Sequence, residues 1–181
     1  MSHPLHKVIG KIIEKNVPSG YELAIDRACG GEQNIPLFSS KNKSNQTEYC
    51  NVDLLILKKD KIKVIIEIEE ADTKPTQICG KYLTSALSSY YIHKSKDNIP
   101  ISMDDSVLFV QILDTENLVK EKTQKSNKWT NIERSIRGII PIKGSKIEEY
   151  KIFSGDKSEF CGEMGNKLIA FIKNYLYKDF E

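Results

Sequence analysis

The chain has 181 residues, of which 39% are hydrophobic and 29% are charged, and its formal net charge is +2. This length suits one well-buried domain, and the composition is that of an ordinary globular protein rather than a disordered or fibrous one. The small net charge excludes a strong global attraction to nucleic acid, so any affinity for DNA must come from local patches.

The sequence shows no sign of membrane insertion or secretion. No apolar run reaches the roughly 18 residues of a membrane span, and the N-terminus lacks a secretory h-region. The four cysteines are scattered without a C-x-x-C pair, which favours reduced thiols over a disulfide framework or a zinc site. These features predict a cytoplasmic protein without membrane contact.

Apolar periodicity predicts the first elements of the chain. An amphipathic helix is expected over about Pro4–Asn16, where apolar residues recur at helical spacing and a proline occupies the first turn. A first strand follows over Tyr21–Ala28 and ends at a pair of glycines. The polar stretch Glu32–Thr47 is too long for an ordinary connection, which favours a functional or disordered loop.

Two apolar runs, Asn51–Leu57 and Ile62–Glu70, flank a polar turn and indicate a β-hairpin whose strands are covered on both faces. Asp53 opens the first run, and Glu67 and Glu69 close the second. A carboxylate on a covered strand is costly unless it is paired, hydrogen-bonded or bound to a cation. The three acids are therefore the first candidates for a functional site.

The length of the turn decides whether Asp53 faces Glu67. A three-residue turn pairs Lys58 with Ile62 and puts Asp53 directly across from Glu67, with Cβ atoms about 4.5–5.5 Å apart. Two carboxylates at that distance could hold one cation. A four-residue turn would point Asp53 to the opposite face, and a bulge could restore the register. The sequence leaves these alternatives open.

Further elements are expected after the hairpin: a helix over Thr76–Ile92, a covered strand over Val107–Leu113, polar helices near Glu116–Gln124 and Trp129–Arg137, a strand over Glu149–Phe153, and an amphipathic helix over residues 168–176. The order helix, strand, strand, strand, helix, strand predicts an α/β fold with a mixed central sheet flanked by helices. We expect a single domain over residues 1–181, with a core at about 4–113 and a helical and strand elaboration at 114–181.

The acids on these strands, in this order of elements, resemble the PD-(D/E)xK nuclease superfamily, and in particular its type II restriction endonucleases. The matched part is roughly residues 4–113, and the motif comprises Asp53, Glu67 and Glu69. Valine precedes Asp53 where the motif name has proline, and Glu69 stands where the usual motif has lysine. Some restriction endonucleases carry glutamate at that position. The resemblance implies a core like that of the restriction endonucleases.

The resemblance also implies metal-dependent hydrolysis of phosphodiester bonds in duplex DNA, with Mg²⁺ as cofactor and Mn²⁺ as a substitute. Clustered carboxylates favour a divalent cation in any case, because the cation relieves their repulsion and attracts a phosphate. Asp53 and Glu67 are the expected metal ligands. Glu69 is expected to orient or deprotonate the attacking water, or to bind a second metal.

Other elements are expected to complete the site. In this superfamily an additional acid often comes from an earlier element, and the candidates are Glu14, Glu32 and Glu48. We prefer Glu32 as the further metal ligand. Lys74, just past the strand, or Lys81, on the following helix, could replace the motif lysine. Gln77 lies one helical turn before Lys81 and could face the same site.

Basic residues in three parts of the chain are the expected contacts with DNA. Lysines suit phosphate contacts, which position a protein on DNA without reading its sequence. The expected contacts are Lys41 and Lys43 in the long loop, Lys58 and Lys59 at the hairpin turn, and Lys125, Lys128, Arg134 and Arg137 around Trp129. Trp129 itself is expected to be a core or interface anchor. Cleavage of both strands by one site per chain favours a homodimer.

Three functions remain open: a Mg²⁺-dependent restriction enzyme, a repair or recombination nuclease of the same fold acting on structured DNA, and an inactive nuclease-fold binding module. The absent motif lysine favours the third, and the presence of all three acids argues against it. A simpler interpretation gives Asp53 a local backbone hydrogen bond and leaves Glu67, Glu69 and Glu70 solvated at an exposed strand end. No metal-ligand spacing is expected among the histidines, His3, His6 and His93.

Overall fold

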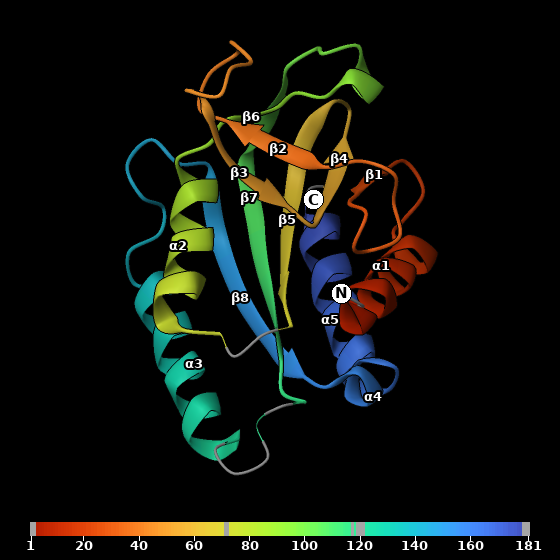
Figure 1. The fold of residues 1–181 in the computed structure, drawn as a ribbon, viewed down its shortest axis with the longest axis vertical. Coiled ribbons are helices and arrows are strands. Elements are labelled where there is room, and N and C mark those ends of the chain that lie inside the picture. The colour runs from red at the N-terminus through yellow and green to blue at the C-terminus, as the bar shows by residue number, and fades with distance from the viewer. Residues whose placement is uncertain (1–2, 71–72, 117, 119–121, 179–181) are drawn as a thin grey trace.

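The computed structural model describes residues 3–70, 73–116, 118 and 122–178 (Figure 1). Its elements, in chain order, are α1 (Pro4–Asn16), β1 (Glu22–Ile25), β2 (Ile35–Phe38), β3 (Glu48–Val52), β4 (Leu54–Lys58), β5 (Lys61–Glu69), α2 (Pro75–Ala86), β6 (Tyr90–Tyr91), the short 3₁₀ helix η1 (Lys94–Lys96), β7 (Ile101–Asp114), α3 (Lys122–Arg137), β8 (Ile147–Gly155), α4 (Lys157–Phe160) and α5 (Glu163–Tyr177). Within the described ranges, no helix is long and apolar enough to cross a membrane.

One mixed sheet of eight strands runs through the molecule. Its order is β1-β4-β5-β7-β6-β2-β3, and β8 pairs with β7 outside this path. β4 and β5 are antiparallel, whereas β7 is parallel to both β5 and β8. β7 is long enough to pair with β6 at its start and with β8 along the rest of its length. The predicted mixed central sheet is confirmed.

Helices cover both faces of the sheet (Figure 1). α2 and α3 pack on one face, in a core that includes Tyr82 and Trp129, and α1, α4 and α5 pack on the other, in a core that includes Ile9 and Leu168. Residues of β5 alternate between the two cores, since Ile65 belongs to the first and Ile66 to the second. The predictions of doubly covered strands and of Trp129 as a core anchor are therefore confirmed.

The predicted elements occur in the predicted order as α1, β1, β4, β5, α2 and β7, and α1 has the predicted bounds. The prediction of Glu32–Thr47 as a loop misses β2, and β3 was not predicted either. β2 has four residues and contains Pro36, which lacks a ladder donor. β3 is mostly exposed and polar, so apolar alternation does not reveal it. These strands pair with each other, and β2 continues through β6 to β7.

Other boundaries differ as well. The helix predicted over Thr76–Ile92 ends at Ala86. Tyr90–Tyr91 instead forms the short strand β6, in which the Tyr91 side chain is buried in the core. The two polar helices near Glu116–Gln124 and Trp129–Arg137 are one helix from residue 122, and residues 117 and 119–121 lie outside the described residues. Lysine and glutamine are good helix formers, which explains the continuity across a segment without apolar residues. β1 is shorter than predicted, β7 and β8 are longer, and the four-residue α4 was not predicted.

Candidate active site

The β4–β5 hairpin sets the position of Asp53. Its turn has two residues, both with positive φ, rather than the three or four that the sequence suggested. A bulge beside Ile56 then shifts the register, so that Leu54 pairs with Ile66. Asp53 directly precedes Leu54 and thus stands opposite Glu67. Asp53 and Glu67 therefore face each other, but because of the bulge and not because of a three-residue turn.

Asp53 is the single residue between β3 and β4. Its Oδ2 accepts a hydrogen bond of 2.6 Å from the Ile68 N–H, and its Oδ1 lies 3.7 Å from His6 Nε2. Burial raises the pKa of the Asp53 carboxyl above its usual value, against the opposing effects of His6 and the Ile68 N–H. The carboxylate is therefore tied to β5 by one oxygen and faces α1 with the other.

Glu67 is the buried centre of the site. Its side chain is 0% exposed, and its Oε2 lies 3.1 Å from Lys81 Nζ. Its Oε1 has no hydrogen-bond partner among the described residues. Burial, followed by the charge of Asp53, raises the pKa of Glu67 well above its usual value. Because buried carboxylate oxygens are costly without a partner, this oxygen is suited to a cation or an ordered water.

Lys81 comes from α2 and reaches both glutamates of β5. Its Nζ lies 3.8 Å from Glu69 Oε1 in addition to its contact with Glu67. Burial alone lowers the pKa of Lys81, but the two carboxylates raise it above its usual value, so the ammonium stays charged. Burial also raises the pKa of Glu69. Lys81 thus brings to the strand end the positive charge that position 69 lacks.

Lys74 and Gln77, the other auxiliary candidates, organise the start of α2 instead. Gln77 Oε1 accepts a hydrogen bond of 2.8 Å from the Lys74 N–H, at a helix start that has proline in its first turn. Both side chains are exposed. Within the described ranges, no contact joins either of them to Glu67 or Glu69. Of the three auxiliary candidates, the structure brings only Lys81 to the acids.

The sequence analysis gave no site role to His6, which lies 3.7 Å from Asp53, or to Glu70, which contacts His6. Glu70 Oε1 accepts a hydrogen bond of 2.7 Å from the His6 N–H and lies 2.9 Å from His6 Nδ1. In the part of the chain that the structure describes, His3, His6 and Glu70 form the one group of three ligands whose atoms all lie within 4.8 Å of one another. The sequence analysis expected no metal-ligand spacing among the histidines, and the structure places two of them beside Glu70 at distances that could hold an ion. The sequence feature that could have indicated this cluster is the i, i+3 spacing of His3 and His6 at the start of a helix.

The three earlier acids make no described contact with this cluster. Glu14, Glu32 and Glu48 are all exposed. The preferred Glu32 lies in a loop, where its backbone oxygen accepts from Arg27 Nε at 3.2 Å. The structure therefore does not bring Glu32 to Asp53 and Glu67. Asp26 is the earlier acid that acts on the site, since its charge contributes to the raised pKa of Asp53.

The donor set fits a hard divalent cation. Asp53 and Glu67 repel each other in a buried place, and one Glu67 oxygen has no partner among the described residues. The oxygens of Asp53, Glu67 and Glu69 do not form a described group of three within 4.8 Å, and Lys81 Nζ contacts both glutamates. Mg²⁺ commonly takes only one or two carboxylates and completes its octahedron with waters and phosphate oxygens. Asp53 and Glu67 supply two carboxylates that face each other across neighbouring strands.

The predicted DNA contacts lie on three separate elements. They are Lys41 and Lys43 in the β2–β3 loop, Lys58 and Lys59 at the tip of the β4–β5 hairpin, and Lys125, Lys128, Arg134 and Arg137 on α3. The hairpin tip is at the opposite end of β5 from Glu67, about 20 Å away by the rise of a strand. Lys43 Nζ donates to Asn98 Oδ1 at 2.9 Å, and Arg137 Nη1 lies 3.9 Å from Glu133 Oε1. The structure does not gather these residues into one patch with the acids.

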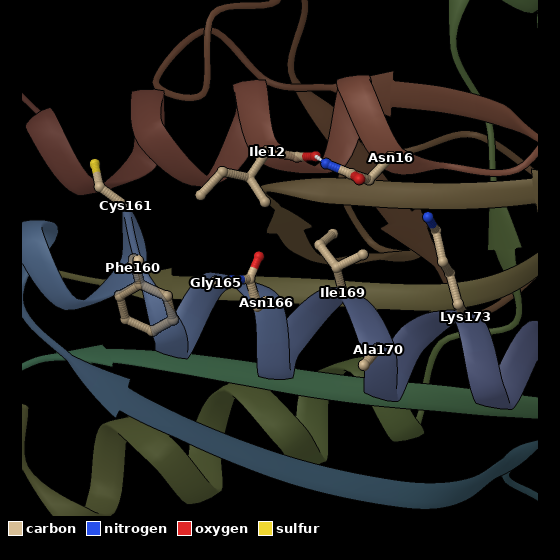
Figure 2. A pocket seen from close by; sticks show the side chains of 10 residues that line it. Ile12, Asn16, Phe160, Cys161, Gly165, Asn166, Ile169, Ala170 and Lys173 are labelled. Atoms are coloured by element: carbon tan, nitrogen blue, oxygen red, sulfur yellow. Dashed lines mark hydrogen bonds between the residues drawn. The ribbon is translucent and has the colours of Figure 1, made fainter.

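A separate groove of about 330 Å³ lies between α1 and α5 (Figure 2). Its polar side chains include Asn16 and Lys173, and Asn16 Nδ2 already donates to the Ile12 carbonyl at 2.9 Å. Among the residues that the structure describes, no carboxylate or histidine lines this groove. Since the described residues gather no group of acids or histidines in this groove, the acids around Asp53 are the better candidate for chemistry.

A buried polar pair, Gln111 and Tyr150, lies on the strands beside Glu67. Gln111 pairs in register with Glu67, and its Oε1 accepts a hydrogen bond from Tyr150. We expect Tyr150→Phe to lower the free energy of unfolding by about 1–3 kcal/mol, because it leaves a buried amide oxygen without its donor. The matched control is Tyr82→Phe, since the Tyr82 hydroxyl has no partner among the described residues. Equal effects of the two variants in urea denaturation would contradict a stabilising role for the pair.

Comparison of the chain with models of protein families, with curated proteins and with solved structures finds no match.

Proposed function

We propose that this protein is a Mg²⁺-dependent endodeoxyribonuclease with a PD-(D/E)xK-type core, which hydrolyses phosphodiester bonds of duplex DNA as a type II restriction enzyme does. The observation that carries the proposal is the contact of Lys81 with Glu67 and Glu69, beside Asp53. A buried acidic site with one charged lysine has the composition needed for phosphodiester hydrolysis, and Lys81 offsets the departure of Glu69 from the usual motif.

Each side chain has a distinct role in this proposal. Asp53 and Glu67 would hold the cation, and a bound Mg²⁺, or Mn²⁺ in its place, lowers the pKa of a water and stabilises negative charge on the phosphate. Glu69 orients the attacking water or accepts its proton. As the water oxygen bonds to phosphorus and one P–O bond breaks, the Lys81 ammonium stabilises the developing negative charge.

The mode of DNA binding is part of the same proposal. The exposed Lys128 and Arg134 on α3 and the lysines of the hairpin tip are suited to phosphate contacts. Because these groups lie on different elements, they would contact phosphates at several points along the duplex. One active site per chain cuts one strand, so cleavage of both strands favours a homodimer in which two sites act together.

The proposal is tested by incubating plasmid and phage duplex DNA with the protein in Mg²⁺, in EDTA, and with the Asp53→Ala variant. We expect discrete fragments with the wild-type protein in Mg²⁺ and none in EDTA. We expect Asp53→Ala to reduce cleavage by at least about 100-fold, the loss that follows removal of one group stabilising transition-state charge. Asp105→Ala is the matched control, because Asp105 is an exposed aspartate outside the site.

The outcome also separates the three functions. Cleavage restricted to junctions, flaps or ends would replace the restriction enzyme with a repair or recombination nuclease. If the folded wild-type protein in Mg²⁺ cuts none of the duplex, junction and flap substrates, the nuclease proposal is wrong. The remaining interpretation would then be a binding module.

A further inference from the structure

Two histidines and a glutamate meet where α1 begins beside the end of β5. His3 is the residue before α1, His6 lies in its first turn, and Glu70 directly follows β5. His6 Nδ1 is 2.9 Å from Glu70 Oε1, and His3 Nδ1 is 4.0 Å from Glu70 Oε2. The two imidazole rings have centroids 5.1 Å apart and meet edge to face.

The cluster is anchored on one side and open on the other. Glu70 is held in place by the His6 N–H, which donates to Oε1 at 2.7 Å, and its side chain is 13% exposed. The His6 side chain is 8% exposed, whereas that of His3 is 45% exposed. Two ligands are therefore preorganised, and an ion would enter past the third.

We propose that His3, His6 and Glu70 bind a transition-metal ion of the Zn²⁺ class, at a second site next to that of Asp53 and Glu67. Imidazole nitrogen suits Zn²⁺, Co²⁺ or Ni²⁺, whereas Mg²⁺ prefers oxygen alone. Ligands about 2.1 Å from a common tetrahedral ion lie about 3.4 Å from one another. The His6–Glu70 and His3–Glu70 separations are 2.9 and 4.0 Å, and the three ligand atoms all lie within 4.8 Å of one another, so the exposed His3 ring would move inward on a shared ion. The negative charge of Glu70 offsets the positive end of the α1 dipole, which otherwise opposes a cation.

The site has a consequence for Asp53. An ion on His6 Nδ1 places the ring proton on Nε2, which faces Asp53 Oδ1 at 3.7 Å. His6 then donates toward Asp53, in the manner of a carboxylate–histidine–metal chain. The second ion would thereby orient a ligand of the first. This coupling rests on the proposed nuclease function, but the binding of an ion at His3, His6 and Glu70 does not.

The inference is tested by titrating Zn²⁺ and Co²⁺ into the full chain without a polyhistidine tag, by calorimetry and by visible absorption of Co²⁺. Excess Mg²⁺ occupies oxygen-only sites, and Glu67→Gln serves as a background in which the catalytic acids are impaired. We expect one ion per chain, with micromolar or tighter affinity, in both the wild type and Glu67→Gln. His3→Ala and Glu70→Gln should weaken binding by at least about tenfold. His93→Ala is the control, because His93 lies near η1, outside the cluster.

His3→Ala decides the result even if Glu70→Gln disturbs α1, since the His3 side chain is half-exposed. Absence of binding, or binding that His3→Ala leaves unchanged, overturns the inference. Binding that Glu67→Gln abolishes also overturns it, because the ion would then sit at the catalytic acids. A protein that binds Zn²⁺ as expected but cuts no DNA contradicts the proposed function alone. A protein that cuts DNA in Mg²⁺ but retains Zn²⁺ affinity in His3→Ala contradicts the second site alone.

Discussion

Replacing Glu67 with glutamine is expected to abolish cleavage and, in EDTA, to stabilise the protein. Cleavage should fall by at least about 100-fold, because the amide cannot serve as a charged metal ligand. The free energy of unfolding at pH 8 should rise by about 1–3 kcal/mol, since the substitution removes a buried charge that has one oxygen without a partner among the described residues. Lys81 is 38% exposed and retains Glu69 and water as partners.

The pH dependence of stability should change in the same variant. Burial raises the pKa of Glu67, so the folded protein keeps a proton that the unfolded chain releases above the usual value of 4.5. The free energy of unfolding therefore falls as pH rises from about that value through the raised one. Glutamine does not titrate, so the fall should be smaller in Glu67→Gln, with Asp53 and Glu69 supplying what remains.

Urea denaturation in EDTA at pH 5 and pH 8 measures both effects. Glu163→Gln is the control, because Glu163 is fully exposed and pairs only with Lys167 in the described contacts. Mg²⁺ should stabilise the wild type more than Glu67→Gln. A Glu67→Gln variant that is less stable than the wild type at pH 8 would mean that the Glu67 charge is well satisfied, and the argument for a cation there would fail.

Replacing Lys81 with alanine should also reduce cleavage by about 100-fold, because the variant loses the charge nearest to Glu67 and Glu69. Lys81→Arg should recover little, since the flat guanidinium does not match a position that an ammonium occupies between two carboxylates. Lys74→Ala is the matched control, an exposed lysine at the start of the same helix. Cleavage rates under single-turnover conditions separate the chemical step from DNA binding.

A double variant tests the role of Lys81 more strictly. Glu69→Lys places the usual motif lysine on β5 but also removes the carboxylate assigned to the attacking water. We therefore expect the double variant to recover the positive charge that Lys81→Ala loses, and with it only part of the activity. Since Glu69 and Lys81 are 3.8 Å apart, the ammonium of a lysine at position 69 reaches the same region. Equal activity of Lys81→Ala and the wild type would contradict the catalytic role of Lys81, and with it the proposed function.

Local patterns predicted much of the fold. Helical spacing of apolar residues defines α1 to the residue, and the apolar runs define β4, β5 and the inner part of β7. These features depend on which residues face a core, which is a property of neighbours along the chain. β2, β3 and β6 escaped prediction, because strands of two to five residues are too short to show a periodicity and owe their conformation to pairing.

The sequence by itself identified the three acids and the apolar runs that carry them, because a carboxylate in a covered apolar run is unusual in any fold. Only the tertiary structure decided the rest of the site. A two-residue turn and a bulge, not the turn length alone, put Asp53 opposite Glu67. The packing of α2 places Lys81, and not Lys74, in contact with Glu67. The packing of α1 brings His6 into contact with Glu70, which is 64 residues away in the sequence. Such contacts depend on how helices are seated against the sheet, and no local spacing in the chain encodes that arrangement.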